Sequence, residues 1–253
     1  MKIQYASDLH LEFLQNTQFL LENPIVPKAD ILVLAGDIVP LGYVKDVTWF
    51  FNYLSENFEQ IYWIPGNHEY YHYSDINRYI GSFNVSIAHE NIHLINNITI
   101  KHEDVNLIFS TLWTKIQDKN IPYIKHGMND YRLIRDNDEM LHPRKTNQLF
   151  EQNITFITSE LKRLQNEKTV VVTHHVPTFL DYPARFKGDV LSEGFVTELS
   201  KIIEEFEPNA WIYGHSHHSR PKFQVGETIM LNNALGYVHS EKTKYQSGRT
   251  LKL

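Results

Sequence analysis

Five short apolar segments in this sequence are each followed at once by aspartate, asparagine or histidine. They occupy residues 2–6, 31–35, 60–64, 169–173 and 210–214, and they are rich in the β-branched and aromatic residues typical of strands. The runs at 31–35 and 169–173 are almost wholly apolar, as in strands buried on both faces. Amphipathic stretches with helical spacing lie between the segments, at 44–58 and 144–167. This alternation predicts an α/β protein with a parallel or mixed sheet packed on helices.

Two further sections add strands outside the regular alternation. Residues 93–113 look like a hairpin, and residues 228–253 contain two more strand-like runs. No internal repeat, low-complexity tract or linker-like segment divides the 253 residues. We therefore expect one domain spanning residues 1–253.

The polar residues that follow the predicted strands form the candidate site. In open α/β sheets, ligands bind beyond the carboxyl ends of the strands. Asp8 and His10 follow the first segment, and residues two apart in an extended chain project to the same side. The other segments are followed by Asp37, by Asn67 and His68, by His174 and His175, and by His215 and His217. Five such strand ends predict that these side chains meet at one place.

Composition excludes several classes of function. The formal net charge of −6 gives no general electrostatic reason to bind nucleic acid or an anionic membrane. No run approaches the roughly 18 apolar residues of a membrane span, and Asp8 and His10 interrupt the place where the apolar core of a signal peptide would lie. The chain has no cysteine, so any metal must be held by oxygen and nitrogen ligands. These features favour a cytoplasmic protein that does not bind membranes.

The ordered motifs resemble those of a known superfamily. They read D-L-H (8–10), G-D (36–37), G-N-H-E (66–69), H-H (174–175) and G-H-S-H (214–217). This order is similar to the calcineurin-like metallophosphoesterase pattern of D-x-H, G-D, G-N-H-[DE], a lone histidine and G-H-x-H, over residues 3 to 218. The resemblance implies a four-layer α/β/β/α sandwich of two mixed sheets flanked by helices. The alternation of strands and helices alone would equally allow a three-layer arrangement.

The resemblance also implies a site for two divalent metal ions. One ion would be held by Asp8, His10, Asp37 and His217, and the other by Asp37, Asn67, His174 and His215. Asp37 would bridge them. His174 is chosen over His175 because it directly follows the strand, and His175 stays open as the alternative ligand. Manganese, iron, zinc, cobalt and nickel all accept such ligands, so the metal is not specified.

Other residues of the motifs receive weaker or different roles. In the resembling family the histidine at the position of His68 contacts the phosphate and protonates the leaving oxygen, which suits a group that titrates near neutrality. Glu69 is expected to orient its neighbours. Arg132 is a candidate phosphate contact, with a solvated arginine as the alternative. His218 is expected at the surface.

The function implied is hydrolysis of small phosphomonoesters or phosphodiesters, nucleotides among them, by attack of a metal-bridging hydroxide. The serine/threonine protein phosphatases continue G-D with an Asp-Arg-Gly segment, which is missing from residues 36–46 here. A nuclease is the alternative enzyme, although the acidic balance argues against a basic groove. A non-catalytic scaffold is the remaining alternative, but every expected motif position is occupied. The oligomeric state is left open.

Overall fold

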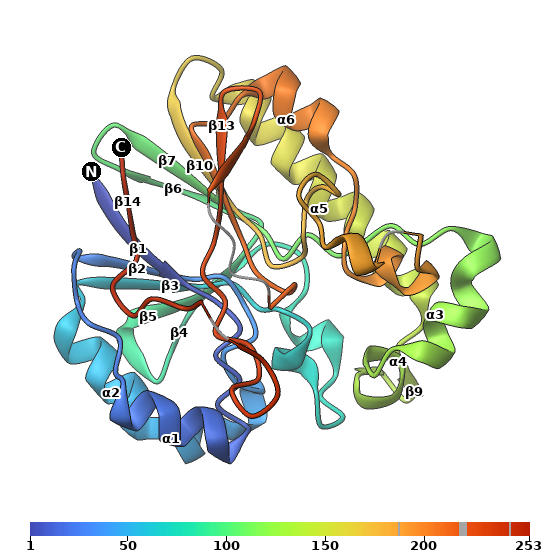
Figure 1. The fold of residues 1–253 in the computed structure, drawn as a ribbon, viewed down its shortest axis with the longest axis horizontal. Helices are drawn as coiled ribbons and strands as arrows, with labels where there is room; N and C mark the ends of the chain where they lie inside the picture. Colours follow the sequence, from blue (N-terminus) through green and yellow to red (C-terminus); the bar gives the residue numbers. More distant parts are fainter. Residues whose placement is uncertain (187, 218–221, 243) are drawn as a thin grey trace.

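A computed structural model describes residues 1–186, 188–217, 222–242 and 244–253; His218 lies outside these ranges. Two six-stranded mixed sheets dominate it (Figure 1). The first sheet has the order β14 (Thr250–Lys252), β1 (Lys2–Ala6), β2 (Ile31–Leu34), β3 (Gln60–Trp63), β5 (His89–Asn96) and β4 (Phe83–Ile87). The second has the order β12 (Phe223–Val225), β13 (Thr228–Asn232), β11 (Ala210–Tyr213), β10 (Lys168–Val172), β7 (Val105–Phe109) and β6 (Ile98–His102).

Helices cover the outer face of each sheet (Figure 1). The first sheet carries α1 (Leu14–Glu22) and α2 (Thr48–Asn57), and the second carries α5 (Pro143–Arg163) and α6 (Ser200–Phe206). Smaller elements complete the described chain: α3 (Ile121–Gly127), α4 (Asp130–Leu133), the pair β8 (Arg135–Asp136) and β9 (Glu139–Met140), and the 3₁₀ turns η1 (Leu41–Val47), η2 (His68–Tyr70), η3 (Ile76–Tyr79), η4 (Asp118–Asn120), η5 (Ala184–Phe186) and η6 (Val190–Gly194).

Three apolar clusters fill the three spaces between the four layers. Because side chains alternate across a strand, Leu32 and Leu34 face α1 and α2 while Val33 faces the other sheet. In β10, Val171 likewise packs against α5 and α6, and Val170 faces the first sheet. Strands apolar on both faces are therefore required in the two inner layers. The four-layer sandwich inferred from the resemblance is the observed fold.

The parallel strands of each sheet end at a common edge. In the first sheet β1, β2, β3 and β5 are parallel, with antiparallel strands at both margins. In the second sheet β7, β10, β11 and β13 are parallel, again with antiparallel margins. The predicted polar clusters follow the carboxyl ends of β1, β2, β3, β10 and β11. They thus come from both sheets, three from the first and two from the second.

The section at 93–113 differs from the single hairpin expected. β6 and β7 do form a hairpin in the second sheet, but β5 belongs to the first sheet and lies parallel to β3. The chain therefore passes from one sheet to the other at Asn97, which has a left-handed backbone (φ 47°). Within the described residues, no helix has the length and apolar character needed to cross a lipid bilayer.

Candidate metal centre

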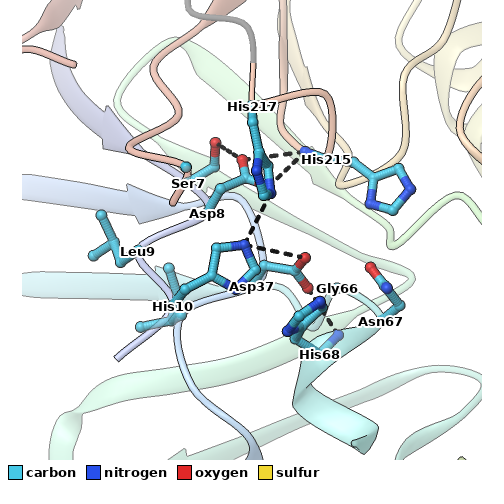
Figure 2. A network of polar contacts seen from close by, with 12 residues as sticks. Ser7, Asp8, Leu9, His10, Asp37, Gly66, Asn67, His68, His215 and His217 are labelled. Carbon is cyan, nitrogen blue, oxygen red and sulfur yellow. Dashed lines mark hydrogen bonds and ion pairs between the residues drawn. The ribbon is translucent and has the colours of Figure 1, made fainter. Parts of the chain in front are cut away.

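Hydrogen bonds between backbone groups and side chains bring the strand ends of the two sheets together. The amide of His215, after β11, donates to the Asp8 carboxylate at 2.9 Å. The Nδ1 atom of His174, after β10, lies 2.9 Å from the carbonyl oxygen of Ala35, after β2. Asp8, His10, Asp37 and His174 are at most 1% exposed. The candidate residues therefore meet at a buried junction of the two sheets (Figure 2).

Most of the candidate ligands have strained backbones. Asp8, His10, Asp37, His215 and His217 all lie in the left-handed region, with φ values of 53°, 47°, 56°, 64° and 48°. Residues other than glycine rarely adopt this conformation, which costs on the order of 1–3 kcal/mol each and clusters at functional sites. Asp8 and His10 do converge, but the extended geometry expected for them is wrong. The chain leaves β1 and turns through left-handed residues at Asp8 and His10, and along this path both side chains reach the junction.

The donor atoms form two groups that share Asp37. Asp8, His10, Asp37 and His217 supply one set of nitrogen and oxygen atoms within 4.8 Å of one another. Asp37, His174 and His215 supply another. The Oδ2 atom of Asp37 lies 3.9 Å from His10 Nε2 in the first group and 3.4 Å from His174 Nε2 in the second. Asp37 thus occupies the position between the groups that a bridging carboxylate needs.

Asn67 and His174 complete the second group, and His175 does not join it. The Oδ1 atom of Asn67 lies 3.2 Å from His174 Nε2. His175 instead turns its Nδ1 toward the carbonyl oxygen of Thr111, and its ring packs on Trp113. Burial and the neighbouring His174 lower the pKa of His175 to about 3, so it is neutral. Between two adjacent histidines, the packing presents His174 to Asp37.

The geometry and charge of the two groups fit bound cations. The Nε2 atoms of His10 and His217 face each other at 2.9 Å (Figure 2), and His174 Nε2 faces His215 Nδ1 at 3.1 Å. Burial opposes a charge on His174, yet the Asp37 carboxylate raises the pKa of that imidazole to about 9. The imidazole nitrogens converge, and the neighbouring carboxylate favours positive charge between them. A site that binds metal ions through oxygen and nitrogen ligands has these two properties.

Two glycines make the close approach possible. A Cβ atom on Gly66 would overlap the side chains of Asp37 and His174, and a Cβ on Gly36 would overlap the His174 ring. Gly36 also has φ 85°, which favours glycine.

Three carboxylates that support the site have no motif to reveal them. Glu241 accepts from His217 Nδ1 at 3.1 Å, and Asp130 accepts from Asn67 Nδ2 at 2.9 Å. Glu12 lies 3.1 Å from His10 Nδ1 and 2.7 Å from His68 Nδ1. Such outer carboxylates orient metal-binding side chains and select the histidine tautomer. The available signal was the alternation of Asp8, His10 and Glu12, each two residues from the last.

Glu69 anchors the two loops that carry Asp37 and Asn67. Its carboxylate accepts four hydrogen bonds, from the backbone N–H groups of Asp37, Ile38 and Gly66 and from the indole of Trp63, at 2.6 to 2.9 Å. The side chain is completely buried. The expectation that Glu69 orients its neighbours therefore matches these contacts.

We expect Glu69→Ala to destabilise the fold by on the order of 4 kcal/mol, because four buried donors would each lose a bond worth about 1 kcal/mol. Urea denaturation followed by circular dichroism measures this. The stability of Glu69→Gln should fall between those of the parent protein and Glu69→Ala, since the glutamine amide keeps one acceptor oxygen. The matched control is Glu56→Ala on the exposed face of α2, which should change stability by less than about 0.5 kcal/mol. Equal midpoints for Glu69→Ala and Glu56→Ala would contradict the anchoring role.

A cavity of about 400 Å³ opens onto the two donor groups. Its lining includes Asp37, His68 and His215 and the apolar or aromatic side chains of Met128, Tyr182, Phe186, Leu191 and Phe195. Tyr71 lines it and stacks on His68 with ring centroids 4.0 Å apart. Arg132 does not line the cavity; it is exposed and donates to the carbonyl oxygen of His126. Arg185 is the one arginine or lysine among the described lining residues.

Comparison with known proteins agrees with this arrangement. The family model described as calcineurin-like phosphoesterase matches residues 1–219. The uncharacterized protein L509 of Acanthamoeba polyphaga mimivirus is 33% identical over 260 residues, covering 94% of this chain and 91% of the viral protein. The crystal structure of phosphopantetheinyl hydrolase from Mycobacterium tuberculosis is similar with a TM-score of 0.68 at 15% identity, covering 94% of this chain and 90% of that one.

The two-sheet sandwich, its clusters of metal-binding side chains and the family match together define a metal-dependent phosphoesterase. The chain belongs to the calcineurin-like phosphoesterase family.

Proposed function

We propose that this protein hydrolyses small phosphate esters with two divalent ions bound at the junction of its sheets. The observation that carries the proposal is Asp37, whose Oδ2 atom is shared between two groups of donors. The proposed ligands of one ion are Asp8, His10, Asp37 and His217, and those of the other are Asp37, Asn67, His174 and His215. Bound there, the ions would polarise the phosphate and activate water.

We assign proton donation to His68. Its imidazole lines the cavity, and its side chain is 10% exposed, so it reaches the substrate space while most of its surface is packed. Burial opposes protonation, but the charges of Asp37 and Glu12 raise the pKa of His68 to about 9. The backbone N–H of His68 donates to Asp37 Oδ1 at 2.9 Å, which holds His68 next to the proposed bridging carboxylate. A protonated imidazole beside the phosphate can supply the proton that a poor leaving oxygen needs.

The cavity supports a small substrate over a polymer. Its volume of about 400 Å³ is that of a site for a metabolite-sized molecule. The apolar and aromatic residues of its lining suit a carbon-rich or planar leaving group, as in a nucleotide. A nuclease, the alternative enzyme, would need many cationic contacts along the nucleic-acid backbone, whereas the described lining offers a single arginine. We also propose that residues 1–253 act as one domain, because β14 at the end of the chain pairs with β1.

The function is tested with a panel of esters on protein reconstituted with manganese. We expect turnover of small mono- or diesters, including nucleotides and a pantetheine phosphate ester, and none of duplex or single-stranded DNA. Excess chelator should abolish turnover while the circular dichroism spectrum persists, because three apolar clusters hold the layers together without metal. Undiminished activity after prolonged chelation, or preferred cleavage of DNA, would overturn the proposal.

A further inference from the structure

Glu12 is a buried carboxylate whose described contacts are with the site alone. Its side chain is 6% exposed and follows β1 by six residues. One oxygen, Oε1, faces the Nδ1 atoms of both His10, at 3.1 Å, and His68, at 2.7 Å. The other oxygen, Oε2, is buried without a hydrogen-bond partner among the described residues.

Glu69 and Glu12 are both buried, but the hydrogen bonds of Glu69 stabilise the fold whereas those of Glu12 hold side chains of the site. Glu69 satisfies both of its oxygens with four N–H donors, three of them from the backbone. Glu12 leaves one oxygen unbonded, which costs on the order of 1–3 kcal/mol for a buried polar group. Burying Glu12 therefore contributes little to the stability of the fold. Its contacts with the imidazoles of His10 and His68 are the interactions that account for its position.

The single oxygen fixes the direction of both imidazoles. His10 turns Nδ1 to Glu12 and is left with Nε2 toward the metal group, where it lies 2.9 Å from His217 Nε2. His68 also turns Nδ1 to Glu12, so its Nε2 is the nitrogen left for a substrate. The two rings lie edge to face with centroids 4.4 Å apart, and Tyr71 stacks on the other side of His68. Figure 2 shows His10 and His68 side by side, although they follow different strands.

We propose that Glu12 is a positioning residue that couples metal binding at His10 to proton donation by His68, by holding both rings through one carboxylate oxygen. The inference rests on the proposed function and deepens it. An imidazole that ligates a metal through one nitrogen commonly donates its other N–H to a carboxylate. Here the same carboxylate oxygen also accepts from Nδ1 of His68, the proposed acid. A change at either imidazole therefore alters the hydrogen bond that Glu12 makes with the other.

A third ion held by His10, Glu12 and His68 is the competing interpretation, since their donor atoms lie within 4.8 Å of one another. It would require His10 to ligate two different ions through its two nitrogens. A proton on each Nδ1 accounts for the same distances with His10 serving one ion only. The number of ions bound per chain separates the two interpretations.

The test compares Glu12→Ala and Glu12→Gln with a matched control, Glu241→Ala. Glu241 contacts a proposed metal ligand, His217, and has no described contact with His68. Isothermal titration with Mn²⁺ should show two ions in every variant, with affinity for one weakened about 10–100-fold in both Glu12→Ala and Glu241→Ala. Only Glu12→Ala, at full metal loading, should lose more rate on an alkyl phosphate ester than on a nitrophenyl ester.

Two further readouts distinguish positioning from a structural role. In the metal-free protein, at a pH high enough to leave the His68 ring neutral, ¹⁵N-histidine NMR should show its single proton on Nδ1. Glu12→Ala should shift that tautomer, whereas Glu12→Gln should largely retain it through its amide oxygen. A double-mutant cycle should show no extra selective loss when Glu12→Ala is added to His68→Ala. The urea midpoint of Glu12→Ala should stay near that of the parent protein, unlike that of Glu69→Ala.

Each contrary outcome has a separate meaning. Equal rate losses on the two esters, an unchanged His68 tautomer, or loss of a third ion would overturn the role of Glu12 while leaving the proposed function in place. Absence of any metal-dependent ester hydrolysis by the parent protein would overturn the proposed function itself.

Discussion

Replacing Asp37 with alanine should reduce ester hydrolysis by about 10³-fold or more and remove both ions from the protein. Its carboxylate is the one donor shared by the two groups. Lewis-acid stabilisation by bound metal is worth several kcal/mol, and every 1.36 kcal/mol changes the rate tenfold. Steady-state rates and elemental analysis of the dialysed protein measure the two effects.

The fold should survive this substitution, because Asp37 is surrounded by charged groups and adds no apolar contact to the three clusters. Asp37→Asn retains the shape of the side chain and serves if the alanine variant expresses poorly. Asp46→Ala, on the exposed surface of η1, is the control and should keep two ions and full activity. Two ions per chain together with surviving turnover in Asp37→Ala would show that the dimetal assignment is wrong.

Replacing His68 with alanine should slow an alkyl phosphate ester by about 10²–10⁴-fold, the usual contribution of general acid catalysis. A nitrophenyl ester should lose much less, because nitrophenolate leaves readily without a proton. The variant should still bind two ions, since His68 is not among the proposed ligands. Rates on both esters at saturating metal, with ion counts on the same samples, measure the difference.

His72→Ala is the matched control for His68. This histidine is exposed four residues further along, and its ring lies against that of Tyr43 instead of lining the cavity. It should leave both rates unchanged. If His68→Ala slows the two esters equally at full metal loading, His68 only positions the phosphate and is not the acid.

Much of the architecture could be predicted from local patterns. The expected strands at 2–6, 31–35, 60–64, 169–173 and 210–214 match β1, β2, β3, β10 and β11 within one residue. A strand that is buried on both faces needs apolar side chains at consecutive positions, and this local pattern can be recognised in the sequence. The layering of two sheets came from the order of motifs, since alternation alone did not distinguish it from a single sheet.

The residues that complete the site are not visible in such patterns. Glu12, Asp130 and Glu241 act through hydrogen bonds to side chains 24 to 63 residues away, and to His10 beside Glu12. From sequence alone, an isolated acidic residue is predicted to be solvent-exposed. Its burial becomes apparent only when the structure places a hydrogen-bond partner from another strand end beside it. Long-range contacts of this kind exist only once the two sheets are packed face to face.

By itself the sequence determined the strand ends at which Asp8, Asp37, Asn67, His174 and His215 stand, because those positions follow directly from where each apolar run stops. Only the tertiary structure decided which way each side chain faces. His174 and His175 follow the same strand, and the choice between them came from Ala35 and Asp37 on the opposite sheet. The left-handed backbones of Asp8 and His10 arose likewise. Local propensity disfavours that conformation, and only the surrounding packed structure can hold it.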